Sequence, residues 1–217
     1  GVKNDPLYRP YLLESVPPKS WYTERAGTWL AINEKPSELA RETWHLAASA
    51  LQAEPEPFET KVASPQTCGA HSGEYCAIWL GPELPDDQRT DDAVSAVFKS
   101  QPLSEHRDIV GAPQITLTLS CDKPQGQIAV RLLDLQPNGA SARITYGVLN
   151  LSHYQSHANP EPLTPNTPIT LTLDLDHIAY RLPGGHRLGV AISSAYWPLV
   201  WPSPEVTELT LSAGAIS

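Results

Sequence analysis

The segment Gln114-Ile115-Thr116-Leu117-Thr118-Leu119-Ser120 alternates strictly between polar and apolar side chains. Successive side chains of a β-strand point to opposite faces, so the pattern predicts a strand with one buried face. Residues 169–175 repeat this alternation even more cleanly. Short strands of this kind, spaced along the chain, predict an all-β fold of the β-sandwich or jelly-roll type. The apolar positions of the other expected strands are Ile128, Val130, Leu132, Ile144, Tyr146, Val148, Leu188, Val190, Ile192, Leu209 and Leu211.

Turn residues separate these expected strands. Lys123-Pro124-Gln125-Gly126 reads as a turn, and Pro137-Asn138-Gly139 is a strong hairpin signal. No helical stretch separates consecutive strands, so parallel crossover connections are not expected. The apolar pattern changes phase at Leu149, which predicts a β-bulge within residues 147–149.

Composition and charge restrict the class of protein. The chain has 217 residues, 22 prolines and a formal net charge of −9. Proline favours turns over long helices, and the acidic balance disfavours nucleic acid and anionic membrane surfaces as partners. No apolar run reaches the roughly 20 residues that cross a bilayer, and no signal peptide is visible. Because the chain begins with glycine rather than methionine, we expect a fragment or a processed piece.

The cysteines indicate a reducing compartment, because an odd number leaves at least one thiol unpaired. We therefore expect a cytoplasmic protein. Cys68 and Cys76 flank His71, but no C-x-x-C pair or second ligand cluster accompanies them. His153 and His157 are four residues apart but follow a strand, so we expect no shared metal. No phosphate-binding glycine loop is present, and no cofactor is expected. The three cysteines are Cys68, Cys76 and Cys121.

The first part of the chain is less regular. Residues 1–28 show no clear period and are interpreted as an irregular arm or linker. Residues 37–52 admit two interpretations. Ser37 could cap a helix whose apolar side chains share one face, or a strand could run through residues 43–48.

Short blocks occur in a fixed order over residues 29–217. In this order they resemble the C-terminal domain of the X-Pro dipeptidyl peptidase and cocaine-esterase hydrolase group, which also contains α-amino-acid ester hydrolases. The blocks are Trp29 to Pro36 with Trp44-His45-Leu46, Asp87-Gln88-Arg89, Ser100-Gln101-Pro102-Leu103, Ile109-Val110-Gly111-Ala112-Pro113, Arg131-Leu132-Leu133-Asp134-Leu135-Gln136-Pro137-Asn138-Gly139, Gly185-His186-Arg187-Leu188 and Ser193-Ser194-Ala195-Tyr196-Trp197-Pro198.

The resemblance implies a jelly roll of the galactose-binding-like type over residues 29–217. It favours the strand over the helix at residues 43–48. It also implies a catalytic Ser, Asp and His on an α/β-hydrolase domain upstream in the same polypeptide, so we assign no catalytic residue here. The chain has no Gly-x-Ser-x-Gly elbow, and we expect it to be inactive alone. The whole enzyme would cleave esters, amides or X-Pro peptides through an acyl-enzyme, and the domain could also support a homo-oligomer.

Two blocks supply candidate structural or interface residues. Asp87, Gln88 and Arg89 lie either at the interface with the missing domain, which Arg89 could bridge, or in a solvated loop. His186 and Arg187 follow two glycines and invite a catalytic interpretation. A structural turn, with Arg187 bound to a carboxylate or to carbonyls, is favoured because no nucleophile accompanies them.

Asp134, Trp197 and Trp201 complete the candidates. We expect Asp134 to anchor the following hairpin through backbone hydrogen bonds. The two tryptophans lie among prolines, and we expect them to pack into a core or a domain interface. A flat pair of exposed rings would instead favour a free-standing carbohydrate-binding module, the principal alternative function. A third interpretation, an independent enzyme, requires a nucleophile that the sequence does not reveal.

Overall fold

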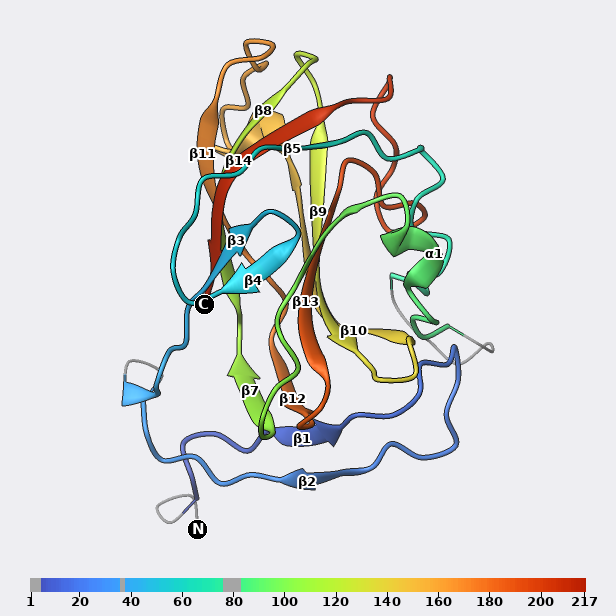
Figure 1. Ribbon diagram of the computed structural model, residues 1–217, viewed down its shortest axis with the longest axis vertical. Coiled ribbons are helices and arrows are strands. Elements are labelled where there is room, and N and C mark those ends of the chain that lie inside the picture. Colours follow the sequence, from blue (N-terminus) through green and yellow to red (C-terminus); the bar gives the residue numbers. More distant parts are fainter. Residues whose placement is uncertain (1–4, 36–37, 76–82) are drawn as a thin grey trace.

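The computed structural model describes residues 5–35, 38–75 and 83–217, and their regular structure is almost entirely β (Figure 1). The larger sheet has ten strands, which in order are β10 (Ser141–Asn150), β9 (Gln127–Leu135), β13 (Arg187–Ser193), β6 (Ala96–Lys99), β4 (Ala50–Gln52), β3 (Trp44–Ala47), β14 (Leu209–Ile216), β8 (Gln114–Cys121) and β11 (Ile169–Asp174), with β5 (Thr60–Val62) paired to β14. The smaller sheet has the order β2 (Gly27–Trp29), β1 (Tyr11–Glu14), β12 (Ile178–Leu182) and β7 (Arg107–Gly111). Helical elements of the described residues include α1 (Arg89–Asp92), which concerns the site, and a short 3₁₀ turn, η3 (Leu151–His153).

The larger sheet curls around a single hydrophobic core, and the smaller sheet closes one end of it (Figure 1). In β8 the apolar residues Ile115, Leu117 and Leu119 are fully buried. On the outer face, the hydroxyls of Thr116 and Thr172 lie 3.1 Å apart across β8 and β11. The predicted all-β sandwich is confirmed, and its galactose-binding-like subtype stays a prediction.

Strand β9, like its neighbour β13, is buried on both of its faces. The predicted core positions Ile128, Val130 and Leu132 are buried, and so are Arg131 and Leu133 on the opposite face. That second face is covered by the segment around α1, whose residues contact the Arg131 side chain. Burial of both faces places one charged side chain of β9 in the interior on each side of the strand, Arg131 on one side and Asp134 on the other.

Residues 44–52 form a β-hairpin, so the helical interpretation of residues 37–52 is wrong and the strand interpretation is confirmed. Leu46 pairs with Leu51 across the hairpin, and both are buried. Spacing of apolar residues at about one helical turn also suits two short strands that each bury one side chain. The proposed helix cap, Ser37, lies outside the described residues.

The described part of the arm, residues 5–28, is largely irregular, but it contains β1 and the start of β2. β1 pairs in parallel with β12 and antiparallel with β2, and its Leu12 is fully buried. The predicted bulge is displaced. The register of β10 shifts between Arg143 and Thr145, earlier than residues 147–149. Gly147 is instead a point of close approach, because a Cβ there would lie 2.8 Å from the carbonyl oxygen of Asp174.

The turn of the β3–β4 hairpin provides a first prediction. Ser49 has a φ of 61°, in the left-handed region that glycine adopts without steric cost. We expect Ser49→Gly to raise the free energy of unfolding by up to about 1 kcal/mol, read by urea denaturation. The matched control is Ser120→Gly within β8, which should lower it by a similar amount because glycine weakens a strand interior. A loss of stability in Ser49→Gly would contradict the prediction.

Candidate functional site

Gln88, the N-cap residue of α1, lies at the centre of a buried polar network. Its Nε2 donates to the carbonyl oxygens of His71 and Asp86, at 2.6 and 2.7 Å. Its Oε1 accepts from the Tyr196 hydroxyl at 3.2 Å and from Arg131 Nη1 at 3.3 Å. All four hydrogen-bonding positions of the amide are therefore used, and Gln88 is a buried structural residue rather than part of a solvated loop.

Two carboxylates of α1 extend this network. Asp91 accepts from the backbone N–H groups of Gly69 and His71, at 2.9 and 3.1 Å. Asp92 accepts from the Ser141 hydroxyl at 2.7 Å and lies 3.0 Å from Arg131 Nη1. We call Gln88, Asp91, Asp92, Arg131 and Tyr196 the α1 cluster. It fixes the segment 69–71 and the start of α1 against β9.

Arg131 is the charged residue at the bottom of the α1 cluster and is fully buried. Nη2 donates to the Ser95 hydroxyl at 2.7 Å, and the guanidinium lies 5.4 Å from the centre of the Tyr196 ring. The contact with Asp92 Oδ1 is an ion pair without hydrogen-bond alignment. Burial raises the pKa of Asp92, and the positive charge of Arg131 opposes that rise. The same burial raises the pKa of the Tyr196 hydroxyl.

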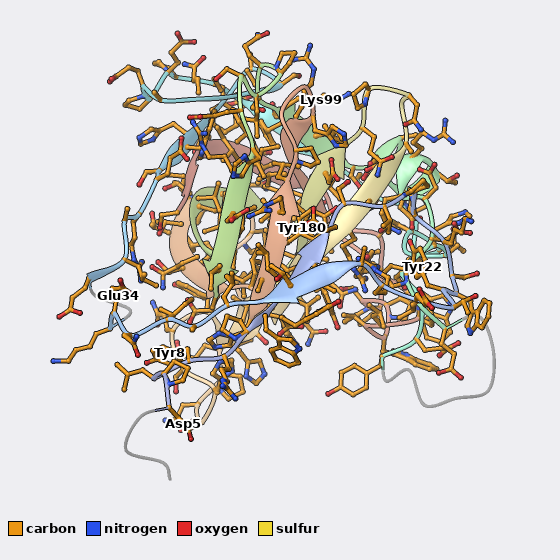
Figure 2. All side chains as sticks on the ribbon, turned by 90° about the horizontal axis from the view of Figure 1, so that it is seen from below. Asp5, Tyr8, Tyr22, Glu34, Lys99 and Tyr180 are labelled. Atoms are coloured by element: carbon orange, nitrogen blue, oxygen red, sulfur yellow. The ribbon has the colours of Figure 1, made fainter. Side chains whose placement is uncertain are left out.

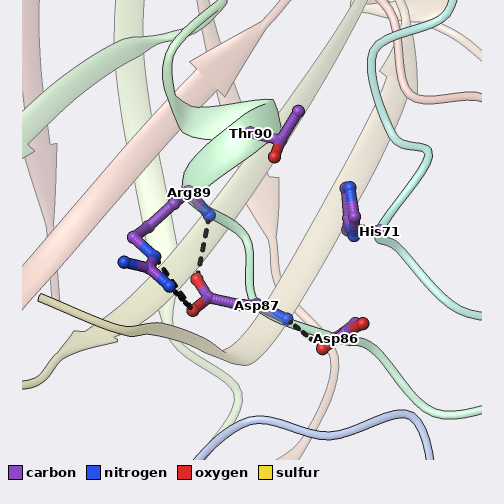
Figure 3. Close-up of a pocket in the computed structure, with 5 residues that line it drawn as sticks. All are labelled: His71, Asp86, Asp87, Arg89 and Thr90. Carbon is purple, nitrogen blue, oxygen red and sulfur yellow. Dashed lines mark hydrogen bonds and ion pairs between the residues drawn. The ribbon is translucent and has the colours of Figure 1, made fainter.

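A shallow hollow of about 360 Å³ lies outside the α1 cluster, lined by His71, Asp86, Asp87, Arg89 and Thr90 (Figure 3). Asp87 holds Arg89 in an ion pair of 2.8 Å and accepts from the N–H of Ser141. Burial tends to raise the pKa of Asp87, but the hydrogen bonds from Arg89 and Ser141 hold it below its ordinary value. The Arg89 side chain is 64% exposed, so the guanidinium faces solvent while Gln88 next to it is buried.

Asp134 forms a second buried polar group on the opposite face of β9, which we call the arm cluster. Its carboxylate is fully buried and accepts from the Ser15 hydroxyl at 2.5 Å and the Tyr180 hydroxyl at 2.8 Å. Nδ1 of His186 lies 2.6 Å from its other oxygen. The expectation that Asp134 anchors the hairpin is therefore wrong: its carboxylate binds side chains, and Asn138 Oδ1 accepts from the Ala140 N–H at the turn. Burial and the neighbouring carboxylate raise the pKa of Tyr180.

The arm cluster contains a serine, a histidine and an aspartate, the residue types of a hydrolase triad, but their hydrogen bonds differ from those of a triad. The Ser15 hydroxyl donates to Asp134 and not to His186, so no base is placed to take its proton. Within residues 5–35, 38–75 and 83–217, no serine or cysteine side chain hydrogen-bonds to a histidine ring. The arrangement instead ties the arm, through Ser15, to β9, β12 and the turn before β13.

Arg187 and the two tryptophans occupy separate places. Arg187 Nη1 donates to the Ser100 carbonyl at 2.8 Å, which joins the start of β13 to the segment after β6. Trp197 and Trp201 meet edge to face, with ring centres 5.1 Å apart and an interplanar angle of 79°. Together with Gln66 they line a hollow of about 380 Å³, and Trp201 is 79% exposed. The pair does not present two coplanar rings.

The described residues place no three His, Cys, Asp or Glu side chains together as ligands for a metal. His153 and His157 do approach each other, with ring centres 5.6 Å apart. Cys76, which was considered with Cys68 and His71, lies outside the described residues. No helix in the described part of the chain is long and apolar enough to cross a membrane.

Sequence reasoning missed six of the nine residues in these two clusters, namely Ser15, Asp91, Asp92, Arg131, Tyr180 and Tyr196. Arg131 lies on the polar side of an alternating strand, where an exposed side chain is the usual outcome. Ser15 lies in an arm without a period, and Tyr180 carries no motif. The available signal was the charge pattern of β9, because Arg131 and Asp134 differ by an odd number of positions and must lie on opposite faces.

A family model, the X-Pro dipeptidyl-peptidase C-terminal non-catalytic domain, matches residues 13–216. The chain belongs to this family. The match therefore spans nearly the whole chain and begins within β1. All four blocks that contribute to the α1 and arm clusters (Asp87-Gln88-Arg89, Arg131 to Gly139, Gly185 to Leu188 and Ser193 to Pro198) lie inside the match.

The curated relatives that match this chain are longer proteins than the chain itself. A Mycobacterium bovis protein named as a candidate serine esterase is 25% identical over 205 residues, which is 83% of this chain and 33% of the relative. The Xaa-Pro dipeptidyl-peptidase of Lacticaseibacillus casei is 24% identical over 173 residues, which is 64% of this chain and 19% of the relative. This chain thus spans a third or less of the length of these curated relatives.

Solved structures show the same fold. An α-amino acid ester hydrolase matches with a TM-score of 0.73 at 18% identity, over 88% of this chain and 39% of that one. A CocE/NonD family hydrolase from Staphylococcus aureus matches with a TM-score of 0.70 at 11% identity, over 99% of this chain and 42% of that one. In both, the X-Pro dipeptidyl-peptidase C-terminal fold is one part of a larger chain.

Proposed function

We propose that this chain is the accessory C-terminal domain of a cytoplasmic serine hydrolase, whose catalytic triad lies on an α/β-hydrolase domain upstream in the same polypeptide. The observation that carries the proposal is the family match over residues 13–216, together with the small share of each relative that the domain covers. The whole polypeptide would cleave an ester, an amide or an X-Pro peptide through an acyl-enzyme.

The two buried clusters support a structural contribution by the domain. The arm leads into the sheet through β1 and is held by Ser15 on Asp134. The α1 cluster fixes the segment 69–71 and the rim that Asp87 and Arg89 form. A rigid rim of charged side chains on an accessory domain is suited to form one wall of a cleft or an interface. Buried free thiols at Cys68 and Cys121 support a reducing compartment.

The test is labelling of the whole polypeptide with a fluorophosphonate probe, followed by mass mapping of the modified peptide. We expect one adduct per molecule, on a serine outside these 217 residues. The matched control is this chain alone, which should gain no mass. An adduct on any serine of this chain would overturn the assignment to an accessory domain.

A second candidate function is that of a carbohydrate-binding module. The hollow lined by Trp197 and Trp201 is the observation in its favour. The edge-to-face geometry opposes it, because sugars stack on flat faces. The side-chain amide of Gln66 is also engaged, donating to the Ser203 carbonyl at 2.6 Å.

We expect Trp201→Ala to change the stability of this chain by no more than about 0.5 kcal/mol, since the ring is exposed. Titration calorimetry with monosaccharides should detect no saturable binding before or after the substitution. Tyr75→Ala, which removes another exposed ring away from this hollow, is the control. Millimolar or tighter binding that Trp201→Ala abolishes and Tyr75→Ala preserves would establish the carbohydrate-binding module.

A further inference from the structure

Among the residues that the structure describes, strand β2 is an edge of the smaller sheet and pairs only with β1. Its even-numbered residues face β1: the Ala26 carbonyl accepts from Glu14, and Leu30 N–H donates to Pro10 at 3.0 Å. Ile32 continues the pattern by exchanging two hydrogen bonds with Tyr8. In an antiparallel pair these positions alternate. The backbone N–H and C=O groups of residues 27, 29 and 31 therefore point away from the sheet.

Apart from its short length, this edge carries no protection against further pairing. Residues 26–32 read Ala-Gly-Thr-Trp-Leu-Ala-Ile, without a charge or a proline. Proteins usually interrupt an exposed edge strand with a charged side chain, a proline or a bulge, because an open row of N–H and C=O groups pairs with other chains. An unguarded apolar edge is consistent with a strand that is covered in the working molecule.

Exposed apolar side chains lie on β2 and on the segment that pairs with its extension. Trp29 is 69% exposed, although its ring packs edge to face on Tyr11 at 5.2 Å. Leu7 is 61% exposed, and Tyr8, bridged to Ile32, is 46% exposed. β1 and β2 run across the end of the molecule seen from below, with Tyr8 close to that end (Figure 2). Exposed apolar side chains and outward backbone groups therefore occur together on this two-stranded ladder.

We propose that the free edge of β2 is extended by a strand from the remainder of the same hydrolase polypeptide, through backbone hydrogen bonds to residues 27, 29 and 31. This inference rests on the proposed function, which supplies the rest of that polypeptide. An extended segment is the only shape that satisfies alternating outward N–H and C=O groups. The apolar flank of Trp29, Leu7 and Tyr8 selects apolar side chains on the incoming strand.

The short length of the edge favours an occupant in the same polypeptide over a second copy. Only three residues offer outward backbone groups, whereas a stable dimer usually buries about 1,600 Å² in total. A tethered segment needs no such area, because its effective concentration reaches about the millimolar range. The net charge of −9 also opposes the approach of two identical copies.

Hydrogen exchange resolved to single amides tests the proposal. In this chain alone, the amides of residues 27, 29 and 31 should exchange freely, while those of Leu30 and Ile32 are slow. In the whole polypeptide, we expect the three outward amides to slow by about 100-fold or more, with Leu30 and Ile32 slow in both. Exchange of the three amides at the same rate in both proteins would overturn the proposal.

Ala31→Pro provides the matched variant, because it removes an outward N–H and no hydrogen bond within this chain. It should leave the melting temperature of this chain nearly unchanged but restore fast exchange at residues 27 and 29 in the whole polypeptide. Leu30→Pro, which removes the bond to Pro10, should instead lower that melting temperature. Retained protection in Ala31→Pro would contradict strand pairing at this edge.

A second copy as occupant has its own signature. Dimerisation of this chain by light scattering, with protection of residues 27, 29 and 31 that rises with concentration, would overturn the assignment to the same polypeptide. The exchange pattern is read independently of the fluorophosphonate label. Absence of a label in the whole polypeptide would overturn the proposed hydrolase and leave the protection result to decide the edge contact.

Discussion

Arg131→Met is expected to lower the free energy of unfolding by about 3–5 kcal/mol, because it leaves the buried carboxylate of Asp92 without its cation. The substitution also removes the donors to Ser95 and Gln88. Methionine has a similar length, so the loss reports charge and hydrogen bonding more than a cavity. Urea denaturation at neutral pH measures the change. The expected loss is a large share of the total stability of a typical domain, about 5–15 kcal/mol.

The control for Arg131→Met is Arg89→Met, which removes an arginine of the same region whose side chain faces solvent. Its ion pair with Asp87 is exposed, so we expect a change below about 0.5 kcal/mol. Equal losses in the two variants would show that the buried pair contributes nothing special. A loss below about 1 kcal/mol in Arg131→Met would also contradict the prediction.

The Arg131→Met defect should also depend on pH. Burial raises the pKa of Asp92 above its ordinary value of 3.8, and Arg131 opposes that rise, so its removal raises the pKa further. A group with a raised folded pKa favours the folded state below its unfolded pKa and loses that contribution as pH rises through the folded pKa. The deficit of the variant is therefore largest at neutral pH and shrinks as the solution is acidified. A deficit that grows on acidification would contradict this assignment.

Asp134→Ala is expected to lower the free energy of unfolding by about 3 kcal/mol and to release the arm. It leaves the hydroxyls of Ser15 and Tyr180 and the ring of His186 without their acceptor. Since Ser15 is the arm's contact in this cluster, trypsin should cleave the variant faster after Lys19. Limited proteolysis and urea denaturation measure the two effects.

Asp174→Ala is the matched control for Asp134→Ala, since it removes an exposed carboxylate with a single side-chain donor, Gln114. We expect it to change stability by less than about 0.5 kcal/mol and to leave cleavage after Lys19 unchanged. If Asp134→Ala loses stability without faster cleavage, the arm is held by its other contacts, which are β1 pairing and the hydrogen bonds that the Val16 and Ser20 carbonyls accept from Gln136 Nε2 and the Leu84 N–H. In that case the clamp assigned to Ser15 is wrong.

The arrangement around β9 shows where sequence reasoning stops. Alternation predicted that Ile128, Val130 and Leu132 face the core, and they do. The same pattern assigned Arg131 to the polar face, since a charged side chain in a strand normally reaches solvent. Its burial depends on α1 and Tyr196, which lie far from it in sequence and meet it only in the folded chain.

The hairpin at residues 44–52 and the arm show the same limit. The spacing of apolar residues in this segment was compatible with a helix and with a strand. The segment forms strands because each of them pairs with a neighbour, β3 with β14 and β4 with β6. Propensity over so few residues is weaker than such pairing. The sequence of the arm has no periodic apolar pattern, yet its strand β1 pairs with β12.

By itself, the sequence determined the all-β class, the turns and the family, because alternation, turn residues and the order of short blocks are local properties of the chain. Only the tertiary structure decided which polar residues are buried, which of them meet, and which strand edge is left open. Those outcomes depend on contacts between residues far apart in sequence, such as Ser15 with Asp134 and Gln88 with Tyr196. A buried charge is stable only where its partners converge on it, and that convergence is a property of the whole fold.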